Sequence, residues 1–125
     1  MKAKKNKILV VDDEPEIRRI IVEHFAPRRY DVREAANGAR AIESIKNTLP
    51  DLIILDILMP VMDGFEFLEK IRKNSVYSDI PVIVLTAKSD PPNLAKGISL
   101  DASFYLPKPF KLSNLTKFVN LILKD

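Results

Sequence analysis

The fold is decided by the stretch ILVVDD, residues 8–13, and by its counterpart LIILD, residues 52–56. In each, four aliphatic residues run directly into aspartate. Such short apolar runs are typical of strands that are buried on both faces, as in a parallel sheet. The carboxylates of Asp12, Asp13 and Asp56 would then stand at the ends of two strands, where they repel one another unless a positive group lies between them. The pattern therefore predicts a cation site.

The composition is that of one ordinary globular domain. The chain has 125 residues, 46% of them hydrophobic, so we expect a single domain over 1–125 that includes a basic N-terminal tail at 1–6. Cysteine is absent, which excludes disulfides and thiolate chemistry and fits a cytoplasmic protein. The single histidine, His24, is expected on a helix surface, and one histidine argues against a histidine-rich metal site or a Ser-His-Asp triad.

The net charge of +3 comes from the N-terminal tail. Four of the 20 basic residues lie in the first seven positions, and the rest of the chain has 16 basic and 17 acidic residues. Because the body carries no basic footprint, direct binding of nucleic acid is not expected. No secretion signal is visible, and no apolar stretch approaches the roughly 20 residues that a membrane span needs.

Strand and helix patterns alternate five times along the chain, as in an α/β sheet with crossover helices on both faces. The predicted arrangement is a doubly wound parallel sheet of five strands in the order 2-1-3-4-5, a flavodoxin-like (βα)5 three-layer sandwich. Strands are predicted near residues 7–11, 31–35, 51–56, 81–85 and 103–106. Helices are predicted after Glu14, Gly38, Asp63 and Asp90 and over 112–124. The first helix would bury Ile17, Ile20, Ile21 and Phe25.

The predicted strand order indicates where a ligand would bind. In open parallel sheets, ligands bind beyond the carboxyl ends of the strands where the order reverses, here between the first and third strands. Carboxylate ligands with room for water and a phosphate favour Mg²⁺ over zinc or a caged calcium. The next two strands end at Thr86 and just before Lys108, whose hydroxyl and ammonium would complete a phosphoryl-binding pocket. Each residue alone could be a cap, a turn or a surface residue, but their coincidence favours a site.

Four segments resemble the motifs of the receiver domain of two-component response regulators: ILVVDDE at 8–14, DILMPVMDG at 56–64, VLTA at 84–87 and YLPKPF at 105–110. The similarity covers essentially the whole chain. It implies a phosphoacceptor in a phosphorelay, which is not a turnover enzyme but catalyses its own phosphorylation and dephosphorylation. The implied partners are a sensor histidine kinase or phosphotransfer protein, and an effector or output domain bound through the fourth helix, fifth strand and fifth helix. A homodimer is a further option.

The resemblance also implies which residues accept the phosphoryl group and bind the metal. Asp56 would attack a phosphohistidine and form an acyl phosphate. Asp13 would bind Mg²⁺ directly and Asp12 through water, together with Asp56 and the backbone carbonyl of Leu58. Mn²⁺ is an alternative metal.

The remaining implied roles concern the phosphoryl oxygens and the switch. Lys108 and Ala87 would contact the phosphoryl group, and Thr86 would form a hydrogen bond to it. Tyr105 would act with Thr86 as a conformational switch. The Lys108-Pro109 peptide is expected to be cis.

Two positions depart from the family pattern, since Arg29 and Asp101 stand where many relatives have glycine. Both sites would need a left-handed backbone, which costs energy for residues other than glycine. No output domain follows Asp125, so we expect either a single-domain regulator or the excised receiver of a longer protein.

Three other functions compete with that of a phosphoacceptor. An aspartate-nucleophile phosphatase needs an Asp-x-Asp-x-Thr run, which residues 12–16 lack. A flavin-binding module needs a hydroxyl- and glycine-rich phosphate loop at the same place, where an acidic loop would repel phosphate. A degenerate receiver that signals without phosphate stays open as an alternative.

Overall fold

The computed structural model describes residues 5–57, 59, 62–86 and 101–123. Their strands form one parallel sheet in the order β2-β1-β3-β4-β5, which confirms the predicted order. The strands are β1 (Asn6–Val11), β2 (Tyr30–Ala35), β3 (Leu52–Asp56), β4 (Val82–Thr86) and β5 (Phe104–Pro107). Every predicted strand boundary lies within one residue of the observed one.

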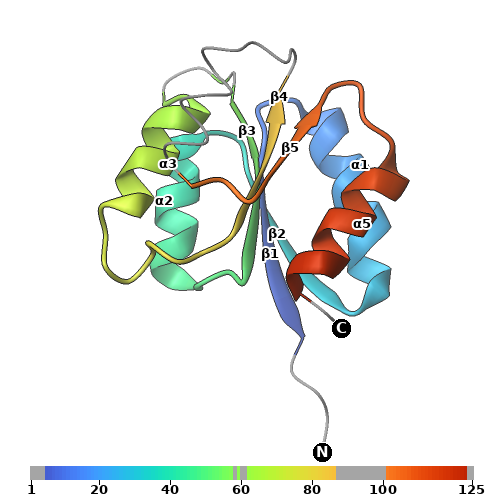
Figure 1. Cartoon of the computed structure of the whole chain (residues 1–125), viewed down its shortest axis with the longest axis horizontal. Coiled ribbons are helices and arrows are strands. Elements are labelled where there is room, and N and C mark those ends of the chain that lie inside the picture. The colour runs from blue at the N-terminus through green and yellow to red at the C-terminus, as the bar shows by residue number, and fades with distance from the viewer. Residues whose placement is uncertain (1–4, 58, 60–61, 87–100, 124–125) are drawn as a thin grey trace, which may run out of the picture.

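Helices cover both faces of the sheet and give the predicted three layers (Figure 1). On one face lie α1 (Pro15–Phe25), followed by the short 3-10 helix η1 (Ala26–Arg28), and α5 (Leu112–Leu123). On the other face lie α2 (Gly38–Asn47) and α3 (Gly64–Arg72). The helix predicted between Asp90 and Leu100 lies outside the described residues. Among the helices that are described, none has the length and apolar character needed to cross a membrane.

Local side chains set where the helices begin. The side chain of Asn37 accepts a hydrogen bond from the N–H of Arg40, and that of Asp63 accepts one from the N–H of Glu66, each at 2.9 Å. These caps satisfy N–H groups that have no partner within the helix. At the start of α1, Pro15 lacks an N–H and fits the first turn without loss.

The central strands are buried on both faces, so their alternating side chains supply two separate cores. Leu55 and Val84 pack with Phe67 on the side of α2 and α3. Ile54 and Leu115 belong to the core on the side of α1 and α5. This two-sided burial explains why the strands are continuous apolar runs instead of alternating ones.

Helix α1 packs through a narrower face than the sequence predicts. Ile21 and Phe25 are fully buried, but Ile20 is 45% exposed, so the prediction that it lies in the core is wrong. With about 100° between successive helical residues, Ile20 stands about 100° from the centre of the stripe formed by Ile17, Ile21 and Phe25. It therefore lies on the flank of α1.

Two turns have the left-handed backbone that the missing glycines predict. The φ angles are 71° at Arg29 and 61° at Asp101. The carbonyl of Asp101 accepts a hydrogen bond from Arg72 at 3.1 Å. The same guanidinium donates to the carbonyls of Ser78 and Ile80 at 3.0 and 2.9 Å. Arg72 therefore ties together the chain segments that precede β4 and β5.

His24 joins α1 to α5 instead of lying free on a helix surface. Its Nε2 atom is 2.7 Å from the hydroxyl oxygen of Thr116, and that hydroxyl lies 2.8 Å from the carbonyl of Leu112, to which it donates. Nε2 must therefore carry the proton and donate to Thr116. Burial, and secondly the positive charge of Arg28, lower the pKa of His24 below its ordinary value of 6.5.

This pKa predicts a pH dependence of stability. Because the folded protein holds His24 neutral more firmly than the unfolded chain does, the unfolded chain binds more protons as the pH falls below 6.5, and the free energy of unfolding decreases. His24→Gln, which can still donate to Thr116, should show a smaller decrease between pH 7 and pH 5. Urea unfolding at the two pH values measures the difference. An identical decrease in both proteins would contradict the prediction.

Candidate functional site

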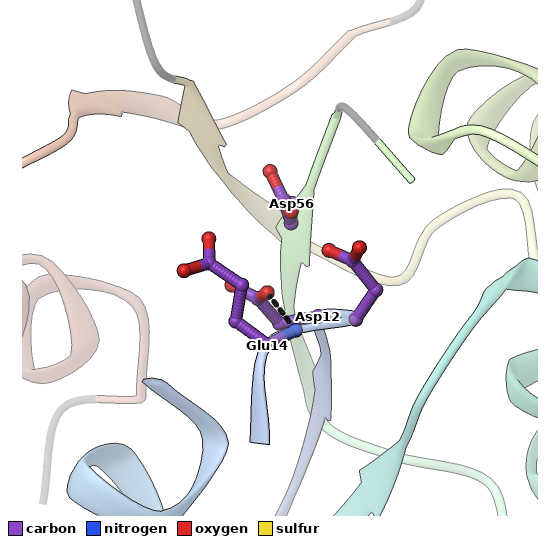
Figure 2. Close-up of side chains that lie close together, drawn as sticks. Asp12, Glu14 and Asp56 are labelled. Carbon is purple, nitrogen blue, oxygen red and sulfur yellow. Dashed lines mark hydrogen bonds between the residues drawn. The ribbon is translucent and has the colours of Figure 1, made fainter. Parts of the chain in front are cut away.

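Four carboxylates converge at the carboxyl ends of the two central strands. The register pairs Val11 of β1 with Leu55 of β3, so the next residues, Asp12 and Asp56, lie side by side. Each of Asp12, Asp13, Glu14 and Asp56 offers a carboxylate oxygen within 4.8 Å of the others. Figure 2 shows Asp12 and Glu14 rising from the loop after β1 and Asp56 from the end of β3. Asp12 and Asp56 are buried, so their charges need partners inside the protein.

The loop after β1 is held in place by its own hydrogen bonds. The Oδ1 atom of Asp12 accepts from the N–H of Glu14 at 2.9 Å (Figure 2). The N–H of Asp12 donates to Ala35 at 3.1 Å. The guanidinium of Arg18 donates to the carbonyl of Asp12 at 2.6 Å and forms an ion pair with Glu34 at 3.1 Å. These contacts fix the direction in which Asp12 presents its second oxygen.

Asp56 is positioned by a close approach between β3 and α3. The N–H of Gly64 donates to the carbonyl of Ile57 at 2.9 Å. A methyl group on Gly64 would lie 2.5 Å from the carbonyl oxygen of Asp56 and 2.7 Å from the Cα of Ile57. Glycine is required here because only a residue without a side chain lets the two backbones meet.

Lys108 supplies the positive charge that the sequence predicts. Its backbone N–H donates to the carbonyl of Thr86 at 2.6 Å, and the Lys108-Pro109 peptide is cis, as expected. Its Nζ atom lies 3.0 Å from Asp12 Oδ2, 3.0 Å from Glu14 Oε1 and 3.5 Å from Asp56 Oδ2. Burial by itself lowers the pKa of Lys108. The hydrogen bonds to Asp12 and Glu14 and the charges of Asp12 and Asp56 outweigh it and raise that pKa above its ordinary value.

The predicted switch residues lie on neighbouring strands. Thr86 ends β4, and Tyr105 of β5 pairs with Val84 two residues earlier, so both side chains point to the α2 and α3 side of the sheet. The hydroxyl of Tyr105 is buried and has no hydrogen-bond partner among the described residues. Burial raises the pKa of that hydroxyl. Leu58 and Ala87, the other predicted site residues, lie outside the described residues.

Sequence reasoning missed Glu14 and Arg18. The sequence predicts Glu14 only as part of a motif and as the residue before the first helix, yet its carboxylate contacts Lys108 as closely as Asp12 does. Its position next to an aspartate pair was the one available signal. Arg18 carries no signal, because its contact to the backbone of Asp12 depends on how α1 leaves the sheet.

The donor set fits a hard divalent cation. All four groups are carboxylates, with no histidine and no cysteine among them. Oxygen donors of this kind suit Mg²⁺ or Mn²⁺ more than zinc or copper. The partly exposed side of the cluster would leave coordination positions for water.

Comparison with known proteins gives the family. The family model described as response regulator receiver domain matches residues 8–120. The chain therefore belongs to the response regulator receiver domains, the phosphoacceptor modules of two-component signal transduction. These are signalling domains and not classical enzymes.

Similar proteins agree with this assignment. The chain is 40% identical over 120 residues to the probable transcriptional regulator ycf27 of Porphyridium aerugineum, covering 96% of this chain and 49% of that protein. It is 36% identical to the response regulator MprA of a Mycobacterium species, covering 94% of this chain and 50% of that protein. The chain thus spans about half the length of the curated relatives it matches.

Solved structures show the same fold. The chemotaxis protein CheY4 of Vibrio cholerae superposes with a TM-score of 0.89 at 34% identity, covering 95% of this chain and 99% of that one. A putative response regulator from Chloroflexus aurantiacus gives 0.90 at 32% identity, covering 98% and 100%.

The close approach at Gly64 predicts a matched pair of variants. Gly64→Ala should lower the free energy of unfolding by about 2 kcal/mol, because the new methyl group meets backbone atoms that cannot move aside. Gly38→Ala is the control, since the atoms nearest to its methyl group would belong to the flexible side chain of Met62 and not to the backbone. Urea unfolding compares the two. Equal losses would contradict the prediction.

The role of Lys108 as counter-charge gives a second prediction. Lys108→Met should lower the free energy of unfolding in EDTA by about 3 kcal/mol, because Asp12 and Asp56 stay buried without their cation. Saturating Mg²⁺ should restore part of the loss. Unfolding in EDTA and in Mg²⁺ tests both statements, with Lys111→Met as an exposed control. A loss no larger than that of the control would refute the role.

Proposed function

We propose that Asp56 is the phosphoacceptor of this receiver and that Asp12 and Asp13 hold Mg²⁺, or Mn²⁺, beside it. The observation that carries the proposal is the ammonium of Lys108, which lies within 3.5 Å of both buried carboxylates, Asp12 and Asp56. Once a buried carboxylate has attacked and carries a phosphoryl group, the site holds more negative charge than before. A cation that already lies beside the carboxylate can neutralise this added charge.

The transfer follows from these positions. A carboxylate oxygen of Asp56 attacks the phosphorus of a phosphohistidine, the phosphorus–nitrogen bond breaks, and its electron pair returns to the imidazole, which takes up a proton. Bound Mg²⁺ supplies neutralisation of the phosphoryl oxygens. Lys108 pairs with one of these oxygens, Thr86 donates its hydroxyl to another, and Ala87 would be a further phosphoryl contact. The backbone carbonyl of Leu58 would be a ligand of Mg²⁺. The same site lets the domain catalyse its own dephosphorylation by water.

The output would pass through the switch residues. Movement of Thr86 toward the phosphoryl group would free space for Tyr105, whose hydroxyl has no partner among the described residues. Such a change would alter the face that the family resemblance assigns to the predicted helix after Asp90, β5 and α5. We propose this face as the one that binds an effector, an output domain or a second copy of the chain.

The phosphodonor would be a sensor histidine kinase or a phosphotransfer protein. A groove of about 350 Å³ beside Lys108, between the start of α1 and residues 108–112, would accept apolar side chains next to the reacting groups. Ile17 and Ile20 line this groove, so the exposed Ile20 would contact the phosphodonor. We propose a single domain over 1–125 that acts in the cytoplasm, where such kinases deliver their phosphoryl groups.

The test is labelling by a small acyl phosphate donor. The native chain should be labelled in Mg²⁺ and not in EDTA, and Asp56→Asn should take up less than about a tenth as much label, because the amide is no nucleophile. Asp51→Asn is the matched control, since Asp51 lies at the opposite end of the same strand, where it accepts a hydrogen bond from Lys7 at 2.7 Å. Equal labelling of the native chain and Asp56→Asn would sink the assignment of Asp56. No labelling of either would favour a receiver that acts without phosphate.

A further inference from the structure

Lys108 is shared unequally among the acidic residues around it. Its Nζ atom is 3.0 Å from Asp12 and 3.0 Å from Glu14, within the range of charge-assisted hydrogen bonds, but 3.5 Å from Asp56. The ammonium of Lys108 therefore lies closer to the carboxylates of Asp12 and Glu14, in the loop after β1, than to the carboxylate of Asp56. If Lys108 is to pair with a phosphoryl group on Asp56, contacts that hold its ammonium near Asp12 and Glu14 have to break.

The local structure around Glu14 favours its contact with Lys108. It is the N-cap residue of α1, yet its side chain forms no capping hydrogen bond, so its carboxylate is available to Lys108. Its backbone N–H is fixed to Asp12, and the following Pro15 restricts the chain further (Figure 2). These constraints keep the carboxylate of Glu14 close to the ammonium.

Glu14 is also the one carboxylate of the cluster to which the proposed function gives no role. A divalent cation held by Asp12, Asp13 and Asp56 would compete with Lys108 for the first and last of them. The contact with Glu14 would persist, and it would then be the main one opposing movement of Lys108 toward a phosphoryl group on Asp56. Since the side chain of Glu14 is 58% exposed, solvent screens the pair and keeps it breakable.

We propose that Glu14 is a positioning residue that retains Lys108 in the unphosphorylated protein and thereby slows phosphorylation of Asp56. The inference rests on the proposed function of Asp56. An exposed ion pair of this kind biases an equilibrium by about two- to fivefold. The retention is therefore a moderate brake, which tunes the rate without preventing the reaction.

Three variants separate retention from net charge. Glu14→Gln removes the charge and the ion pair, whereas Glu14→Asp keeps the charge near the cluster but is one methylene too short to hold Lys108 equally well. Glu16→Gln removes one negative charge two residues further along, from a side chain with no hydrogen bond or ion pair to a described residue. With a small acyl phosphate donor at saturating Mg²⁺, both Glu14 variants should be labelled about two- to fivefold faster than the native chain. Glu16→Gln should keep the native rate.

A second readout does not depend on the reaction. In the metal-free protein, the hydrogen bonds to Asp12 and Glu14 should slow proton exchange of the Lys108 ammonium enough to give a ¹H–¹⁵N cross-peak. This cross-peak should weaken or vanish in both Glu14 variants and persist in Glu16→Gln. A role of Glu14 in folding alone would leave it unchanged in the folded protein.

The outcomes are distinct. Faster labelling of both Glu14 variants together with loss of the cross-peak supports the inference. A native rate in Glu14→Gln, or a faster rate there but not in Glu14→Asp, overturns it, because the effect would then be absent or due to charge alone. A native chain that takes up no label in Mg²⁺ overturns the proposed function, whereas a labelled native chain with an unchanged Glu14→Gln overturns only this inference.

Discussion

The structure depends on one electrostatic constraint, the burial of two carboxylates where the strand order reverses. Asp12 and Asp56 are almost fully removed from solvent at the ends of adjacent strands, and the ammonium of Lys108 contacts both. Removing a charge from water costs several kcal/mol unless it is paired. The order of the sheet is therefore tied to the chemistry, because only the adjacency of β1 and β3 brings the carboxylates together, and only the return of the chain after β5 brings the lysine to them.

Several contacts around the site restrain the backbone and do not themselves bind a ligand. Gly64 lets α3 approach the backbone of Asp56, Arg18 holds the loop of Asp12, and the carbonyl of Thr86 fixes the backbone of Lys108. Each restraint acts on a different strand end. Together they hold like charges within 4.8 Å of one another before any metal or phosphoryl group arrives. Preorganisation of this kind is what allows a short side chain to act as a nucleophile without a large rearrangement.

The sequence predicts those features that depend on local pattern. Strand order and strand boundaries follow from apolar runs and from the alternation of strand and helix patterns. The left-handed turns at Arg29 and Asp101 follow instead from the resemblance to a family in which glycine is common at both positions. The carboxylate cluster and its lysine follow from what stands at each strand end. Contacts such as Glu14 with Lys108, or His24 with Thr116, join positions more than 90 residues apart and depend on the tilt of α1 and on side-chain direction. No local pattern records those two quantities. The wrong assignment of Ile20 has a different cause, because its position about 100° from the centre of the buried stripe of α1 follows from helical periodicity alone.

Of the three ion pairs of Lys108, the two shorter ones, with Asp12 and Glu14, differ in a way that suits a reversible switch. The pair with Asp12 joins a fully buried carboxylate to a lysine that is 15% exposed, so breaking it without a replacement cation is costly. The pair with Glu14 has the same length but faces solvent, where screening makes it weak. A strong contact keeps the resting protein stable, and a weak one can be exchanged for a new anion at little cost. Because both end on the same ammonium, the proposed phosphoryl group on Asp56 would replace the weak contact first, and the site would respond without first becoming unstable.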